Sequence, residues 1–271
     1  MTFSIITATH NVSSVLHCLL ESLATQTFRD FQLIIQDGAS TDSTLDIIES
    51  YRSRLPKVLV ESASDRGIYD AWNKALDRAG ETLGQWVLFL GGDDKLADPF
   101  VLERVANKIR SVSDNVDYFS CDLIKTSSSC AQELPLVLAE NPVKTLRFGM
   151  PCGHPALFHR GRLFTTNRFS TQYRIAGDYD FLIRTLKKDS QIVRYAICAV
   201  YMADGGISSS PISRNLLMQE NQKILKKYFY LSHLFHIFYL HLKAKIQLLC
   251  RRTFITRNLW HLAKKIKNLF S

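Results

Sequence analysis

The feature that most constrains the fold is an alternation of short apolar runs with helix-like segments over the first 110 residues. The apolar runs are rich in β-branched residues and too short for helices, which is typical of buried strands. The segments between them carry apolar residues at helical spacing. The expected strands are residues 3–9, 31–36, 58–60 and 85–90, and the expected helices are residues 12–25, 43–51, 67–78 and 98–109. This alternation predicts an α/β fold with a parallel sheet and helices on both faces.

The pattern changes after about residue 111. Further strands are expected at residues 116–122, 150–158 and 191–201, and a helix is expected to begin near Asp178. Residues 126–132 and 204–214 are small and polar, so we expect loops there, the second of them mobile. We therefore divide the chain into two halves of one domain, residues 1–110 and 111–220, followed by a tail of residues 221–271.

Polar side chains follow all four expected strands of the first half. They are Thr9 and Asn11; Asp37, Ser40 and Asp42; Asp65 and Arg66; and Asp93 and Asp94. Three of the four clusters combine an acid with a glycine, and two glycines before Asp93 indicate close approach by a ligand. Ligands of parallel sheets bind beyond the carboxyl ends of the strands. The sequence therefore predicts a binding site at this edge of the sheet.

Absent motifs narrow the choice of ligand. The chain contains no GxGxxG, no GxxxxGK[ST] and no GxSxG, which disfavours a standard dinucleotide site, a P-loop nucleotidase and a serine hydrolase. Acidic loops suit ribose hydroxyls, base amides and a divalent cation that bridges to phosphate. We therefore expect a nucleoside diphosphate together with Mn²⁺ or Mg²⁺.

The net charge of +9 belongs to the tail. Residues 221–271 hold eleven lysines and arginines and no acid, so residues 1–220 carry −2, which is +9 less +11. The uncharged apolar stretch 228–242 is shorter than the roughly 20 residues of a transmembrane helix. We expect residues 228–271 to lie on an anionic membrane surface as a basic amphipathic helix. A core helix followed by a solvated basic helix is the alternative, and nucleic acid is disfavoured because no binding motif accompanies the charge.

Six scattered cysteines without a CxxC spacing predict reduced thiols in a cytosolic protein. The first nine residues read as a strand rather than as a signal peptide. Both observations favour a cytoplasmic protein.

Five segments resemble the signatures of the family 2 inverting glycosyltransferases, which have the GT-A fold. They are SIITATHN (4–11), QDGASTDSTLDII (36–48), SDRGIYDAWNKAL (64–76), GQWVLFLGGDD (84–94) and AGDYDFLIRTL (176–186). The resemblance covers about residues 1–210 and is nearest to bacterial enzymes that build surface polysaccharides. It implies a mostly parallel, Rossmann-like sheet flanked by helices. It also implies that residues 1–110 bind the nucleotide-sugar and that residues 111–220 bind the acceptor and carry the catalytic base.

The resemblance also implies a role for each candidate residue. Asp94 would coordinate Mn²⁺ or Mg²⁺, Asp93 would contact the ribose or the donor sugar, and Asp178 would deprotonate the acceptor hydroxyl. The remaining substrate-binding candidates are Thr7, Thr9, Asn11, Asp37, Ser40, Asp65, Arg66 and His154.

Structural roles are open to several residues of these segments. Asp42 and Asp65 precede helices, where a carboxylate can accept hydrogen bonds from the first backbone N–H groups. Asp180 and Arg184 are four residues apart, the spacing of a structural ion pair on a helix. Trp72 is expected to belong to the core.

The sequence as a whole predicts a metal-dependent inverting glycosyltransferase. It would move a sugar from a nucleotide donor, with UDP the favoured nucleotide, to a polyprenyl-diphosphate-linked glycan at the inner face of the cytoplasmic membrane. One alternative is a sugar-phosphate nucleotidyltransferase, whose usual glycine-rich basic loop is missing from residues 8–14. The other is a non-catalytic nucleotide-sugar-binding membrane scaffold, which would need neither Asp94 nor Asp178.

Overall fold

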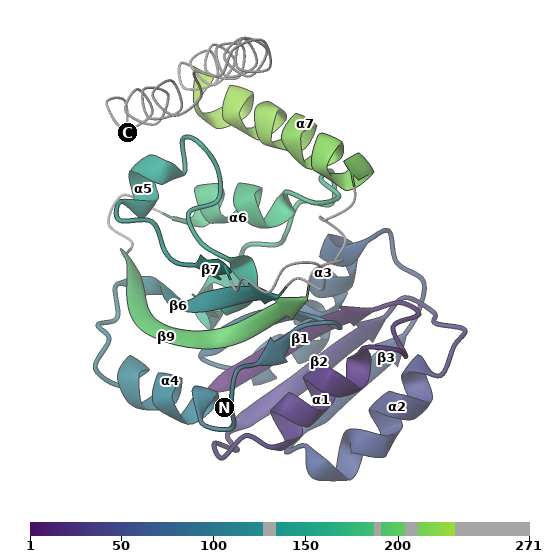
Figure 1. Ribbon diagram of the computed structural model, residues 1–271. Helices are drawn as coiled ribbons and strands as arrows, with labels where there is room; N and C mark the ends of the chain where they lie inside the picture. The colour runs from purple at the N-terminus through teal and green to yellow at the C-terminus, as the bar shows by residue number, and fades with distance from the viewer. Residues whose placement is uncertain (127–133, 187–190, 204–210, 231–271) are drawn as a thin grey trace, which may run out of the picture. The chain divides into compact units, whose positions relative to one another are not determined.

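The computed structural model describes residues 1–126, 134–186, 191–203 and 211–230 (Figure 1). The chain divides into two compact units, residues 1–138 with 152–217 and residues 139–151 with 218–271. All of the candidate site residues belong to the first unit. The expected mobile segment 204–210 and most of the basic tail lie outside the described residues.

The first part of the chain forms the predicted parallel sheet with its helices. The strands are β1 (Phe3–Thr9), β2 (Phe31–Asp37), β3 (Val58–Ser62) and β4 (Trp86–Gly91), paired in parallel in the order β3-β2-β1-β4. The helices are α1 (Leu16–Ala24), α2 (Thr44–Tyr51), α3 (Ile68–Ala79) and α4 (Val101–Ile109). This order brings the ends of all four strands to one edge.

Both faces of the central strands are covered. On one face, alternate residues of β1 such as Phe3 and Ile5 pack in a core with α1, α2 and α4. On the other face, α3 packs against β1 and β2. Every residue of β2 is buried, as expected for a strand between two helical layers. The start of α3 is thereby placed beside the ends of β1 and β2.

The sheet continues with a mixed second half. β8 (Leu157–Arg160) pairs antiparallel with β4 and with β6 (Val116–Thr126), and β9 (Gln191–Ala203) pairs in parallel with β6. The short strands β5 (Lys95–Leu96) and β7 (Leu134–Leu136) pair antiparallel with β9 and β6. In Figure 1, β9 curls strongly along this part of the sheet, and its ladder with β6 has register shifts. Figure 1 also labels α5 (Pro142–Thr145), α6 (Gly177–Thr185) and α7 (Pro211–Tyr228).

Three expectations need correction. The predicted strand 150–158 is wrong over most of its length: residues His154–Ala156 form a 3-10 helix, and β8 begins only at Leu157. Pro155 explains this, because a proline cannot donate a hydrogen bond to a strand ladder. α4 begins at Val101 rather than 98, because the Asp98 side chain accepts the N–H of Phe100 at 2.8 Å and forms a turn there. Residues 211–214, expected in a loop, form the start of α7.

No helix in the part of the chain that the structure describes has the length and apolar character needed to cross a membrane. Trp72 belongs to the core, as predicted, because its side chain is 5% exposed and its ring lies 4.7 Å from that of Phe89.

Candidate functional site

One pocket of the first unit brings the end of β4 together with the first turn of α6. Its volume is about 200 Å³, and its lining includes Asp93, Asp94, His154 and Asp178. These four candidates come from three distant segments of the sequence. Tyr69 of α3 also lines the pocket. The fold therefore gathers both predicted acid motifs in one place.

The acid pair follows directly from β4. Asp94 is 3% exposed, and its Oδ2 accepts the backbone N–H of Gly91 at 2.7 Å. Burial raises the pKa of Asp94 to about 7, and the negative charge of Asp93 adds to that increase. Within the described ranges, neither carboxylate forms an ion pair with a basic side chain. The site therefore holds a buried acid with no basic partner in the part of the chain that the structure describes.

The two glycines before the acid pair have different surroundings. A Cβ at Gly91 would lie 2.8 Å from Oδ1 of Asp93, and a Cβ at Gly92 would lie 3.3 Å from a methyl carbon of Val12. Clearance for a ligand was the expectation from the sequence. The structure shows that Gly91 leaves room for the Asp93 side chain itself.

Asp178 lies in the first turn of α6, where one of its carboxylate oxygens is anchored. Its Oδ1 accepts the N–H of Tyr179 at 2.9 Å and lies 3.1 Å from the hydroxyl of Tyr69. Its Oδ2 has no hydrogen-bond partner among the residues that the structure describes. Asp180 is fully buried and pairs with Nε of Arg184 at 2.7 Å, so the predicted structural ion pair is confirmed.

His154 is a buried, neutral ring. It is 8% exposed and stacks on Trp72 and Phe89 with ring centroids 5.3 and 5.7 Å away. Burial lowers the pKa of His154, and the nearby charge of Asp178 opposes this only in part. A neutral imidazole offers a hydrogen bond to a hydroxyl, whereas it offers no charge to a phosphate.

Asp37 ties together the ends of β1, β2 and β3. It is fully buried, and its carboxylate accepts the hydroxyls of Thr9 at 2.8 Å, Ser40 at 2.5 Å and Ser62 at 2.6 Å, and also the N–H of Ser40 at 2.8 Å. Burial alone would raise the pKa of Asp37, but these bonds outweigh it and hold the pKa below the usual value. Asp37 and Thr9 therefore stabilise the loops of this edge.

Asn11 links the loops that follow β1 and β2. Its N–H donates to Oγ of Ser40 at 2.8 Å, and its side-chain oxygen accepts the N–H of Thr41 at 2.9 Å. Asp42 accepts the N–H groups of Thr44 at 3.0 Å and of Ser13 at 3.1 Å. Hydrogen bonds from Thr44 and Ser13 lower the pKa of Asp42, which supports its structural role.

Thr7 and Asp65 differ in whether a ligand can reach their side chains. Thr7 is fully buried within β1 and its hydroxyl has no hydrogen-bond partner among the described residues, so we assign it a packing position. Asp65 accepts the N–H of Gly67 through Oδ1 at 2.8 Å, so it stabilises the turn before α3 but forms no cap hydrogen bond with the first turn of that helix. Its Oδ2 lies 2.7 Å from where a Cβ of Gly38 would be and has no partner within the described part of the chain. Asp65 can therefore accept a hydrogen bond from a ligand.

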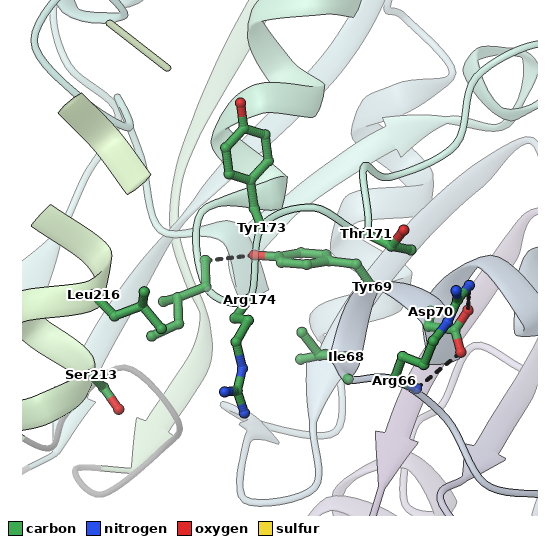
Figure 2. A pocket seen from close by; sticks show the side chains of 11 residues that line it. Arg66, Ile68, Tyr69, Asp70, Thr171, Tyr173, Arg174, Ser213 and Leu216 are labelled. Atoms are coloured by element: carbon green, nitrogen blue, oxygen red, sulfur yellow. Dashed lines mark hydrogen bonds and ion pairs between the residues drawn. The ribbon is translucent and has the colours of Figure 1, made fainter. Parts of the chain in front are cut away.

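Arg66 lies at a second pocket, shown in Figure 2. Its side chain is 80% exposed and its Nη2 lies 3.2 Å from Oδ1 of Asp70. The pocket has a volume of about 230 Å³ and shares Tyr69 and Arg174 with the first pocket. In Figure 2 Ile68 lies between the Arg66–Asp70 pair and the side chain of Arg174, with the ring of Tyr69 above it in this view.

Sequence reasoning missed Tyr69, Lys125, Arg174 and Met202, which also line the first pocket. Tyr69 stands within the segment 64–76, for which the sequence predicted a core position only at Trp72. Its polar contacts reach residues more than 100 positions away, so no local signal marked them.

Comparisons with known proteins agree on one family. The family model described as glycosyl transferase family 2 matches residues 4–163. A PGL/p-HBAD biosynthesis glycosyltransferase of Mycobacterium tuberculosis is 35% identical over 223 residues, covering 79% of this chain and 82% of that protein. The Escherichia coli UDP-Glc:alpha-D-GlcNAc-diphosphoundecaprenol beta-1,3-glucosyltransferase WfaP is 31% identical over 118 residues, 43% of each chain.

Two solved structures show the same fold. Residues 1–349 of Staphylococcus aureus TarS in complex with UDP-GlcNAc superpose with a TM-score of 0.64 at 22% identity, covering 84% of this chain and 71% of that one. The Pyrobaculum calidifontis mannosyltransferase PcManGT in complex with GDP-Man and Mn²⁺ gives 0.58 at 16% identity, covering 98% and 86%. The predicted GT-A fold is confirmed.

Proposed function

This chain belongs to glycosyl transferase family 2 and is a transferase, and we propose that it moves a sugar from a UDP-linked donor to a lipid-linked glycan, with inversion at the anomeric carbon. A UDP donor is supported by the TarS complex and by the name of the WfaP relative. The same relative's name, which includes a diphosphoundecaprenol acceptor, supports a lipid-linked glycan.

One observation carries the proposal: the acid pair Asp93–Asp94 and the acid Asp178 line the same pocket. An inverting transfer needs a positive group at the departing diphosphate and one base at the attacking hydroxyl. The pocket offers an acid pair for the first task and a separate carboxylate for the second. A scaffold that only binds a nucleotide-sugar needs neither.

The acid pair fits a divalent cation. Asp94 is a buried carboxylate with a raised pKa and no basic partner among the described residues, so a cation would supply the charge that the protein lacks. No group of three His, Cys, Asp or Glu side chains is close enough to hold a metal in the described ranges. We propose that Asp94 would hold the ion beside the diphosphate of the donor. When bound, Mn²⁺ or Mg²⁺ neutralises the charge of the departing diphosphate.

We assign the base to Asp178. Its Oδ2 takes the proton of the acceptor hydroxyl. At the same time the oxygen of that hydroxyl forms a bond to the anomeric carbon. The bond from the anomeric carbon to the phosphate oxygen breaks, and the nucleoside diphosphate leaves with the electron pair. One carboxylate is sufficient because this single displacement forms no covalent intermediate with the protein.

The nucleoside is proposed to bind at the ends of β1, β2 and β3. Asp65 contacts the base or ribose through Oδ2, and Asp37 and Ser40 hold the loops in place. Asp93 contacts the ribose or the donor sugar. The buried, neutral His154 hydrogen-bonds a sugar hydroxyl.

The placement in the cell is part of the proposal. Residues 1–110 bind the donor and residues 111–220 the acceptor, and residues 228–271 attach the protein to anionic lipid at the inner face of the cytoplasmic membrane. The eight lysines and arginines of residues 228–271 support this attachment. Deleting residues 228–271 should release the protein from vesicles that contain phosphatidylglycerol. Unchanged vesicle binding would reject the attachment.

The test uses full-length protein with Mn²⁺ and three probes, UDP-glucose, UDP-N-acetylglucosamine and UDP-galactose. UDP release is measured enzymatically, and UDP affinity is measured by calorimetry with and without Mn²⁺. We expect Asp94→Ala to lose the Mn²⁺ dependence of UDP affinity, and Asp178→Asn to keep UDP affinity while UDP release falls at least about 100-fold. Asp46→Asn, an exposed acid of α2, is the matched control. Wild-type turnover in both site variants would reject the assignment.

A further inference from the structure

Tyr69 connects α3 to the loop that leads into α6. Its hydroxyl donates to the carbonyl oxygen of Ile175 at 2.5 Å, the contact drawn in Figure 2, and lies 3.1 Å from Oδ1 of Asp178. The side chain is 4% exposed. It is therefore a buried tyrosine whose polar end touches the carboxylate assigned as base.

The ring of Tyr69 is held on several sides. It stacks on Phe169 with centroids 5.7 Å apart and meets the edge of Trp72 at 5.4 Å. It also packs against the backbone of Gly177, where a Cβ would lie 2.7 Å from ring atoms Cδ2 and Cε2. Such a contact is possible only with glycine, so Gly177 brings the start of α6 directly against the ring.

The two carboxylate oxygens of Asp178 differ in their hydrogen-bond partners. Oδ1 accepts the N–H of Tyr179 and lies 3.1 Å from the hydroxyl of Tyr69, which it shares with the carbonyl of Ile175, whereas Oδ2 has no partner within the described ranges. A backbone N–H and a shared hydroxyl beside one oxygen restrict the rotation of the carboxylate. The oxygen left over is the one available to a substrate.

The hydroxyl of Tyr69 has one proton and two acceptors. A charged carboxylate is the stronger acceptor, so an ionised Asp178 competes with the carbonyl of Ile175 for that proton. Burial raises the pKa of Tyr69 well above its usual value, with the charge of Asp178 adding to the rise. The hydroxyl therefore remains a donor throughout the pH range of an assay.

We propose that Tyr69 is a positioning residue for the transfer, holding Oδ1 of Asp178 so that Oδ2 is presented to the acceptor hydroxyl. The inference rests on the proposed role of Asp178 as base. Loss of the hydroxyl leaves the carboxylate with one anchor, and its misplacement slows proton removal. We expect donor binding to be kept, because the Tyr69 hydroxyl bonds to Ile175 and Asp178 and, among the described residues, to neither the acid pair nor Asp65.

The experiment is Tyr69→Phe in the full-length chain, assayed with Mn²⁺ and whichever of UDP-glucose, UDP-N-acetylglucosamine and UDP-galactose the wild type turns over fastest. We expect kcat to fall about 10- to 100-fold, with the KM for the donor and the affinity for UDP unchanged within about twofold. Tyr51→Phe is the matched control, because the Tyr51 hydroxyl also donates to a carboxylate, Glu21 Oε2, at 3.1 Å. It should keep wild-type kcat.

Two further variants separate positioning from stability. Gly177→Ala displaces the ring without removing a hydroxyl and should lower kcat in the same range. Adding Tyr69→Phe to Asp178→Asn should lower kcat no further, because residues that act as a unit are not additive.

Three results would overturn the inference: wild-type kcat in Tyr69→Phe, an equal loss of UDP affinity, or an additive loss in the double variant. Failure of the proposed function looks different, since Asp178→Asn alone would then keep its turnover.

Discussion

Replacing Asp94 with asparagine is predicted to stabilise the metal-free protein at pH 8. The carboxylate is 3% exposed at the end of β4, and burial raises its pKa from the usual 3.8 to about 7. Asparagine has the same shape and keeps an acceptor for the N–H of Gly91. It differs in carrying no charge that burial would penalise.

The sign and size of this effect follow from the raised pKa. The folded state holds the Asp94 proton more tightly than the unfolded state, so stability falls as pH rises from about 4 to about 7 and is constant above that. A shift of about three units at about 1.4 kcal/mol per unit gives roughly 4 kcal/mol as the upper limit of the difference at pH 8. At pH 4 the two proteins should unfold with nearly equal free energies.

The assay is urea unfolding in EDTA at pH 4, 6 and 8, followed by tryptophan fluorescence. We expect the variant to exceed the wild type progressively as pH rises. Adding Mn²⁺ with UDP should then stabilise the wild type more than the variant. Asp46→Asn controls for a general effect of lost charge. A difference that does not change with pH, or a destabilised variant at pH 8, would refute the argument.

Three further predictions concern single positions. Gly91→Ala puts a Cβ 2.8 Å from Oδ1 of Asp93. UDP release, measured together with a melting curve, should therefore fall about 10-fold or more. Unchanged release would contradict the inference that Gly91 leaves room for the Asp93 side chain. Gly161→Ala overlaps the carbonyl oxygen of Gly84, so the free energy of unfolding in urea should fall by at least about 1–3 kcal/mol, and an equally stable variant would show that the backbone adjusts. Asp65→Asn should weaken UDP binding in calorimetry about 10-fold with kcat nearly unchanged, whereas full affinity would remove Asp65 from the nucleoside site.

The parallel part of the fold could be predicted because its signals are local. Strands β1, β2 and β4 are short apolar runs buried between two helical layers, and that burial gives them a continuous apolar composition. The mixed half was harder to predict. β8 is four residues long, follows Pro155, and is stabilised by strands far away in the sequence.

In the candidate site, the individual residues could be predicted from local signals, whereas their meeting in one pocket could not. Asp93 and Asp94 end a strand, and Asp178 begins a helix, so each stood out beside a local signal. That the three line one pocket is a tertiary fact. The network around Asp37 likewise depends on three strand ends meeting, so the sequence suggested a ligand contact at a carboxylate that the structure shows fully hydrogen-bonded within the protein.

Asp178 is proposed to act as the single base opposite the acid pair in one displacement. The most direct test is the anomeric configuration of the first product, recorded by proton NMR during turnover of an α-linked UDP-sugar before mutarotation. We expect a β-configured product, and a much slower appearance of that product in Asp178→Asn. An α-configured product, or an unchanged rate in that variant, would contradict the proposal.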